Sequence, residues 1–261
     1  MNGNIIDVYP DNKKNVMVTW LTGHNRVFKI EDNYSPSFYV YSKREKLINL
    51  ATLLRDFSQI ESLNFNFEKI TLGSDKKKFV LEVTPKKLES LRKLSETIDS
   101  WGGYHDYLLF NVDLRLSSRY LQDKFVFCNA KVKWDGKKFI SEDEEWAIDY
   151  SIPDYKTTTF DIKRRTKNKI FSFEDPIKSI IIGENVICEG NEADTILLAV
   201  KQLKHIDPDI IYTNKGDSVK FPYLYHRAKL SGIQNSLTLG RDEKKPLNPT
   251  KNSREPEKAR K

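Results

Sequence analysis

The sequence has 261 residues, enough for two domains of ordinary size, and includes 14 Phe, 12 Tyr and 4 Trp. This supply of side chains for hydrophobic cores argues against a wholly disordered protein. The formal net charge of +7 favours an anionic partner, nucleic acid first, although a lysine-rich surface that binds nothing is equally consistent with it.

The cysteines and the apolar segments indicate where the protein resides. Cys128 and Cys188 are far apart and have no metal-ligand spacing, which is typical of a protein of the reducing cytoplasm. No apolar run reaches the length of about 18 residues that a membrane-spanning helix needs. We therefore expect a soluble cytoplasmic protein with no membrane partner.

The first 100 residues mix strand and helix patterns. Residues 16–20 and 26–30 flank a turn and predict a hairpin, and residues 37–41 and 79–83 predict further strands. Residues 43–57 have helical spacing instead, with four leucines expected on one buried face: Leu47, Leu50, Leu53 and Leu54.

The next helix is predicted to begin near Thr84, which is suited to cap it, with Pro85 in its first turn. It ends at Gly102-Gly103, and four apolar residues form its buried stripe: Leu88, Leu91, Leu94 and Ile98. Elements in this order predict an α+β domain with antiparallel strands over residues 1–150.

The second part of the chain alternates strands with helices. Residues 157–162, 177–182 and 210–212 predict buried strands, and residues 192–205 and 221–230 predict helices. The first of these helices is expected to bury Ile196, Leu197, Val200 and Leu203. Helical connections between strands predict a partly parallel α/β domain over residues 151–240.

The last 21 residues, 241–261, have a different composition. They contain eight Lys or Arg residues against four Asp or Glu residues, and three prolines interrupt them. This composition predicts a basic, disordered tail.

Several segments of the second part resemble archaeal family B DNA polymerases. The stretch from Asp207 to Asp242 resembles the region of that family's second exonuclease motif, through Asp207–Ile211, Gly216–Ser218, Phe221–Leu224, Arg227-Ala228 and Gly240–Asp242. Phe160-Asp161-Ile162 resembles the first exonuclease motif. Softer matches to the family's N-terminal domain are Phe28–Glu31, Pro36 with Phe38-Tyr39, and Arg119–Leu121.

The resemblance implies an N-terminal domain followed by a 3′→5′ exonuclease domain of ribonuclease-H-like fold. That domain is expected to be incomplete, because the family's third exonuclease motif lies further downstream. The family's chemistry uses two divalent metals held by four carboxylates, since Mg²⁺ and Mn²⁺ prefer hard oxygen ligands.

The sequence departs from the family at two of these carboxylates. The first motif ends in Lys163 where the family has Glu, and Lys220 stands where the second motif has a metal-binding Asp. At about 4 Å and an effective dielectric of about 20, a dication and an ammonium repel by several kcal/mol. The degenerate site of Asp161, Lys163 and Lys220 is therefore expected to hold no metal and to have no catalytic residue. Mg²⁺ is expected only for an intact site.

Other interpretations of these residues stay open. Asp161 is otherwise a strand-end residue satisfied by backbone donors, and Asp217 is a weak candidate for a replacement ligand. The two lysines are either drifted surface residues or cations that hold a DNA phosphate in place of the metals.

The resemblance also implies a pocket that reads uracil in template DNA. The positions that match are Pro36, Ser37, Pro85, Leu88, Leu114, Leu116 and Arg119. Ser37 and Leu116 replace expected aromatic residues, which loosens the walls that would hold a flipped base. The alternative is that these residues only pack the domain.

Together these features predict a noncatalytic DNA-binding part of an archaeal family B DNA polymerase, split or inactivated, acting in replication or repair. Its expected partners are single-stranded DNA and a separately encoded C-terminal part of the polymerase. The alternative is an active 3′→5′ exonuclease or a polymerase component once that second part is present.

Overall fold

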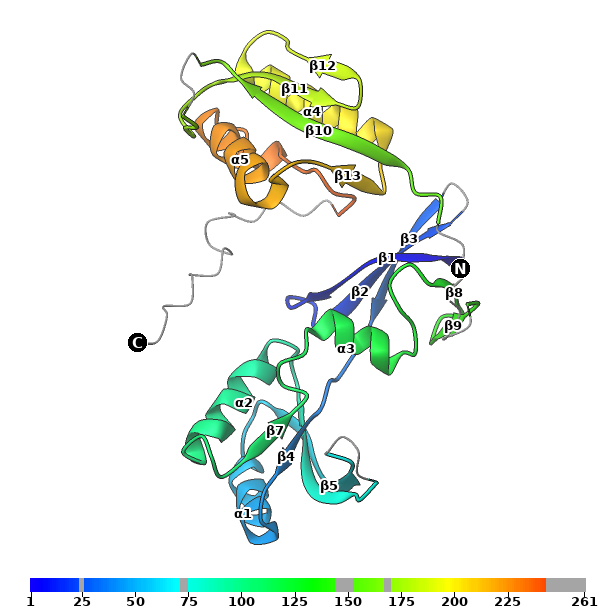
Figure 1. The fold of residues 1–261 in the computed structure, drawn as a ribbon, viewed down its shortest axis with the longest axis vertical. Helices are drawn as coiled ribbons and strands as arrows, with labels where there is room; N and C mark the ends of the chain where they lie inside the picture. The colour runs from blue at the N-terminus through cyan, green and yellow to red at the C-terminus, as the bar shows by residue number, and fades with distance from the viewer. Residues whose placement is uncertain (24–25, 71–74, 144–152, 167–169, 243–261) are drawn as a thin grey trace. The chain divides into compact units, whose positions relative to one another are not determined.

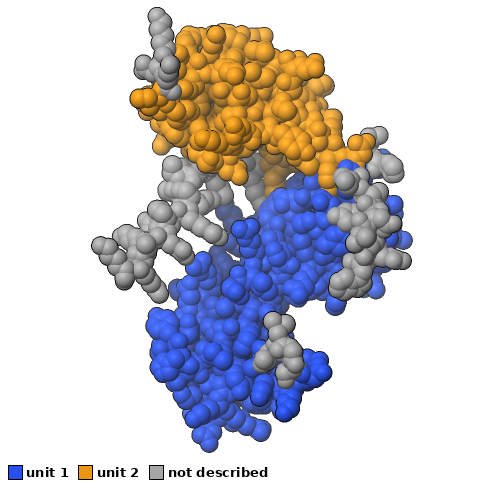
Figure 2. Space-filling view, viewed as in Figure 1, with its two compact units in different colours: residues 1–153 blue, residues 154–261 orange. Residues whose placement is uncertain are grey.

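The computed structural model describes residues 1–23, 26–70, 75–143, 153–166 and 170–242. The chain divides into two compact units, Met1–Pro153 and Asp154–Lys261 (Figure 2). This division lies close to the point near residue 150 where the sequence pattern changes. The predicted disordered tail, residues 241–261, lies almost entirely outside the described residues.

The first unit contains a five-stranded antiparallel sheet, built from strands near both ends of the unit (Figure 1). In spatial order its strands are β3 (Arg26–Asp32), β2 (Val16–Gly23), β1 (Asn2–Asp11), β8 (Lys131–Trp134) and β9 (Phe139–Ser141). The predicted hairpin is confirmed, because β2 and β3 pair in an antiparallel register.

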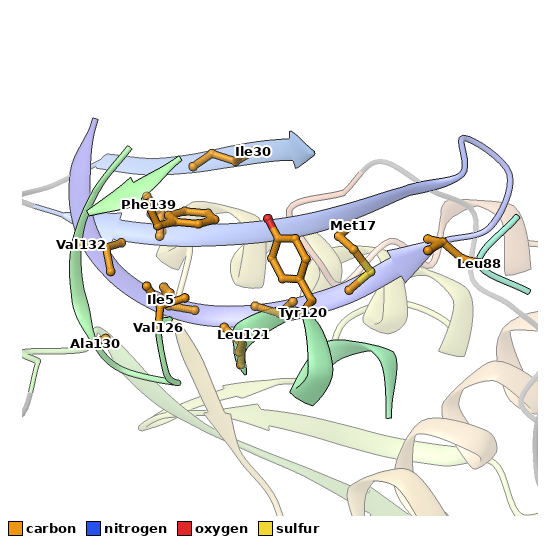
Figure 3. Packing of buried hydrophobic residues seen from close by; sticks show 12 residues of the cluster. Ile5, Met17, Ile30, Leu88, Tyr120, Leu121, Val126, Ala130, Val132 and Phe139 are labelled. Atoms are coloured by element: carbon orange, nitrogen blue, oxygen red, sulfur yellow. The ribbon is translucent and has the colours of Figure 1, made fainter. Parts of the chain in front are cut away.

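Helix α3 (Leu116–Asp123) closes the core of this sheet (Figure 3). Tyr120 and Leu121 of α3 belong to one core cluster with Ile5 and Met17 of the sheet. The buried hydroxyl of Tyr120 donates a hydrogen bond to Asp32 over 2.8 Å. This bond satisfies a polar group that would otherwise be costly to bury.

The first unit also holds a four-stranded antiparallel sheet with two helices. The strand order is β5 (Ile60–Glu68), β6 (Lys78–Pro85), β4 (Phe38–Tyr41) and β7 (Leu108–Phe110). Helices α1 (Arg44–Leu54) and α2 (Ser90–Trp101) pack their leucines against these strands in a single core cluster.

Two predictions for these helices are wrong. Leu53 is 61% exposed, because the buried stripe of α1 is formed by Leu47, Leu50 and Leu54. Helix α2 begins at Ser90, since Thr84 and Pro85 still belong to β6 and pair with β5. Pro85 is tolerated in this inner strand because the pairing register shifts between Ile60 and Ser62, and such irregularities accommodate proline.

The second unit contains a four-stranded sheet in the order β12 (Asn185–Ile187), β11 (Ile177–Ile182), β10 (Thr157–Arg164) and β13 (Ile210–Tyr212). The predicted partly parallel arrangement is confirmed, because β10 and β13 are parallel whereas β10–β11 and β11–β12 are antiparallel.

Two helices complete this unit, α4 (Glu192–Ile206) and α5 (Phe221–Leu230). Asn191 and Asp194 form a reciprocal capping box at the start of α4. Leu197 does not point inward as predicted, because Ile196, Val200 and Leu203 form the buried stripe and leave it 38% exposed. Among the described residues, no helix is long and apolar enough to cross a membrane.

Candidate functional site

Asp161 lies on β10, the strand that connects the two halves of the sheet in the second unit. It pairs with Ile181 of β11 on one side. On the other side the pairing between β10 and β13 ends at Thr159, so the Asp161 carboxylate lies just beyond the paired part of that edge. Its Oδ1 accepts a hydrogen bond from the backbone N–H of Ile162 over 2.8 Å.

A π-helical turn, Gly216–Lys220, brings Lys220 to this carboxylate. Gly216 allows the tight entry to the turn, since a Cβ there would lie 2.5 Å from a side-chain carbon of Thr213. The turn runs directly into α5, whose first turn contains Pro222. The Nζ of Lys220 lies 2.6 Å from Oδ1 of Asp161, and its side chain is only 19% exposed. Single π-turns are frequent at functional sites.

Lys163 completes the cluster from the same strand. It is two residues from Asp161, so both side chains lie on one face of β10. Its Nζ lies 3.4 Å from Oδ2 of Asp161, and the lysine side chain is mostly exposed. The structure therefore brings all three predicted residues of the degenerate centre together, with two ammonium groups on one carboxylate.

The electrostatics of the cluster keep Asp161 ionised. Partial burial pushes the pKa of the carboxyl upward, but the hydrogen bonds from Lys220 and from the Ile162 N–H, with the charges of Lys220 and Lys163, hold it below its usual range. The cluster thus carries one negative and two positive charges at neutral pH.

These residues do not fit the two divalent metals that the resemblance implies. A hard dication requires several oxygen ligands, and here both Asp161 oxygens are occupied by ammonium groups. No group of three or more His, Cys, Asp or Glu side chains suited to a metal ion occurs among the described residues. Asp217, the candidate for a replacement ligand, is exposed on the π-turn.

The positions predicted for uracil recognition lie in the first unit, and two of them meet. Arg119 of α3 is buried and donates hydrogen bonds to the carbonyl of Ser37 and, over 3.0 Å, to the carbonyl of Asn111. The Ser37 hydroxyl donates to Glu82 over 2.7 Å. Arg119 therefore joins segments that are 82 residues apart, with its guanidinium directed at backbone carbonyls.

The remaining positions of this set differ in burial. Pro36, Pro85 and Leu88 are buried, and Leu88 packs in the core of the five-stranded sheet. Leu116 is half-buried and packs against the cores of both sheets of the first unit. Leu114 is exposed. Packing therefore accounts for most of these side chains, and their role in uracil recognition stays a prediction.

Arg241, near the end of the matching stretch, has a role that the sequence did not indicate. Its guanidinium donates to a carboxylate oxygen of Asp207 over 2.6 Å and to one of Asp209 over 2.9 Å. Asp207 ends α4 in a left-handed conformation, and β13 begins directly after Asp209. Arg241 thus holds the connection between the helix and the parallel strand.

Known proteins are similar to this chain in sequence and in fold. Residues 131–261 match the model for DNA polymerase family B, exonuclease domain. The DNA polymerase of Archaeoglobus fulgidus is 28% identical over 249 residues, which cover 88% of this chain and 30% of that protein. The DNA polymerase of Methanocaldococcus jannaschii is 29% identical over 242 residues, which cover 84% of this chain and 14% of that protein.

The family B DNA polymerase of Pyrobaculum calidifontis has a similar fold, with a TM-score of 0.72 and 22% identity over 92% of this chain and 34% of that one. The chain spans about a third or less of the length of these proteins. Because the family model covers half of the sequence, the chain belongs to the family B DNA polymerases, of whose exonuclease domain it carries a homologue.

Proposed function

We propose that this chain is a noncatalytic DNA-binding part of an archaeal family B DNA polymerase, with an N-terminal domain and an incomplete ribonuclease-H-like domain. The observation that supports this most directly is the contact of Lys220 and Lys163 with Asp161. The resemblance implies carboxylate side chains at the positions of Lys163 and Lys220, where they would bind the metals. Two ammonium groups there oppose a dication instead of binding it.

The same charges suit a phosphate. Asp161 neutralises one of the two ammonium groups, so the cluster keeps a net positive charge, and Lys163 is accessible to solvent. An ammonium binds phosphate as a point charge with freely oriented donors. We propose that the degenerate centre contacts the backbone of a single strand without cutting it.

The alternative, an active exonuclease or a polymerase component, requires catalytic carboxylates from outside the described residues. A separately encoded C-terminal part is the partner that would supply them. Activity that appears only when such a part is added to the purified chain would favour this alternative.

Binding to single-stranded DNA is expected to weaken steeply with salt. Each phosphate that a lysine neutralises releases about 0.7 counterion from a single strand, so the affinity falls with a slope of that size per contact. Fluorescence anisotropy with a labelled oligonucleotide from about 50 to 200 mM salt measures this slope. Lys163→Glu should lower both affinity and slope, whereas Lys201→Glu, which alters an exposed lysine of α4, provides a charge-matched control. Absence of binding at low salt would contradict the proposal.

A second function, uracil recognition in the first unit, is favoured by one observation. Arg119 holds the backbone of Ser37 through a contact across 82 residues, which orders one predicted wall of the pocket. We expect a strand with deoxyuridine to bind more tightly than the same strand with thymidine. One methyl group is worth about 1–3 kcal/mol in an apolar pocket, and because Ser37 and Leu116 loosen the walls we expect the low end of this range, about tenfold at most. Competition binding with the two oligonucleotides tests this. Equal affinities would mean that the seven predicted pocket residues only pack the domain.

A further inference from the structure

Three phenylalanines form an aromatic surface on the β5–β6 hairpin of the first unit, with Phe65 and Phe67 exposed and Phe79 partly buried beneath them. Phe65 and Phe67 alternate with Asn64 and Asn66 along β5, so the two rings lie on one face of the sheet. Phe79 of β6 lies directly opposite Phe67 in the register. The ring of Phe79 is parallel to that of Phe65, with centroids 5.2 Å apart and planes at 11°, and it meets Phe67 edge-on at 5.5 Å.

The rings lie on the face of β5 and β6 that packs against α1 and α2, beyond the part that these helices cover. Leu63, Leu81 and Val83 lie on the same face and pack in the core with α1 and α2. Beyond them, Phe65 is 44% exposed and Phe67 is 59% exposed. Aromatic rings that remain accessible next to a completed core indicate a contact surface.

One basic side chain contacts the rings, and lysines flank them along the hairpin. The guanidinium of Arg44, the first residue of α1, lies 4.8 Å from the centroid of Phe79. Lys76, Lys77 and Lys78 are exposed immediately before Phe79, and Lys69 follows β5 in an ion pair with Asp75. The nearby acidic residues Glu45, Glu68 and Asp75 balance only part of this charge, so the surface is cationic.

We propose that this surface, formed by Phe65, Phe67, Phe79 and Arg44, binds single-stranded DNA by stacking its bases. Aromatic rings accept bases of any sequence, and the surrounding cations attract the phosphates, which is the combination that single-strand-binding proteins use. A purely apolar protein partner would suit a neutral rim better, because it would desolvate these cations without pairing them. The surface lies in the first unit, so it does not depend on whether the degenerate centre contacts DNA.

The test compares ring removal with ring replacement in the full chain. Phe65→Leu with Phe67→Leu keeps apolar bulk but removes both π-faces, and it should weaken binding of a labelled oligo-dT about tenfold or more. Phe67→Trp enlarges the π-face and should bind at least as well as the wild type. Circular dichroism confirms that each variant is folded, and oligo-U in place of oligo-dT separates RNA from DNA binding.

Each outcome decides the matter. Unchanged affinity of the double Leu variant would overturn this surface and leave the proposed function in place, whereas a wild type that binds no DNA would overturn both. A wild-type dimer that the Leu substitutions dissociate, with unchanged DNA affinity, would assign the rings to a protein contact. Should the variant fail to fold, ultraviolet cross-linking of the wild type to an iodouracil oligonucleotide decides: adducts at residues 65–67 support the surface, and adducts only elsewhere overturn it.

Discussion

Purified protein supplied with Mg²⁺ or Mn²⁺ is expected to leave the 3′ end of a single-stranded oligonucleotide intact. Phosphodiester hydrolysis by a two-metal centre needs ions to activate the water and to stabilise the leaving oxygen. Here Asp161 is the one carboxylate of the three-residue cluster, and Lys220 occupies its Oδ1 at 2.6 Å. Gel analysis of an end-labelled oligonucleotide, with and without chelator, measures the result. Metal-dependent shortening that disappears in Asp161→Ala would prove the expectation wrong.

The same argument predicts metal binding directly, without reference to activity. Isothermal titration of the wild type with Mn²⁺ should show no binding that depends on Asp161. Lys163→Glu combined with Lys220→Asp replaces two ammonium groups by two carboxylates around Asp161, and this variant should gain a Mn²⁺ site. The control pair, Lys163→Gln with Lys220→Asn, removes the cations without adding anionic ligands and should gain little. Equal Mn²⁺ affinity in both double variants would show that the lysines do not decide occupancy.

The sequence predicted the long, regular elements better than their ends. The β2–β3 hairpin and helices α4 and α5 have clear periodicity over seven or more residues, and each forms where the pattern places it. The start of α2 was wrong because Thr84 and Pro85 suit a helix start locally, while tertiary pairing with β5 extends β6 through both of them. Short strands such as β9 and β12, of three residues each, are too brief to show alternation.

The candidate site was predictable in its membership but not in its geometry. The resemblance to the family's motifs identified Asp161, Lys163 and Lys220 as a set. Lys220 and Asp161 are 59 residues apart, and their 2.6 Å ion pair depends on the π-turn, which no local pattern predicts.

The aromatic surface was missed for a related reason. In sequence, Phe65, Phe67 and Phe79 resemble ordinary core residues of strands. Only the structure shows that Phe79 packs at the margin of the core with α1 and α2, and that Phe65 and Phe67 are exposed beyond it.

Breaking the ion pair between Arg227 and Glu192 is expected to destabilise the second unit strongly. Arg227 of α5 donates to Glu192 of α4 through Nε over 2.8 Å and through Nη2 over 2.5 Å, and both side chains are largely buried. The pair is also joined to the sheet, since the backbone N–H of Ile177 donates to Oε1 of Glu192 over 2.7 Å, the oxygen that also accepts from Arg227 Nε. Removing one partner of a buried pair leaves the other charge uncompensated, which typically costs about 3–5 kcal/mol.

Arg227→Met should therefore lower the free energy of unfolding by about that amount, whereas Lys229→Met, an exposed change on the same helix, should alter it by less than about 0.5 kcal/mol. Urea denaturation followed by circular dichroism measures both. Hydrogen exchange of residues 177–182 and 221–230 locates the effect in the second unit.

The pH dependence of this loss distinguishes an ion pair from simple packing. Burial alone would raise the pKa of Glu192, but the hydrogen bonds from Arg227 and from the Ile177 N–H, with the charge of Arg227, lower it. A carboxyl with a lowered pKa in the folded state stabilises the protein above its unfolded pKa, about 4.3, and loses this contribution as the pH falls through the folded value. The difference in unfolding free energy between wild type and Arg227→Met should therefore be constant from about pH 6 to 8 and shrink below about pH 4. A difference that stays the same down to pH 3 would mean that Arg227 contributes by packing rather than by charge.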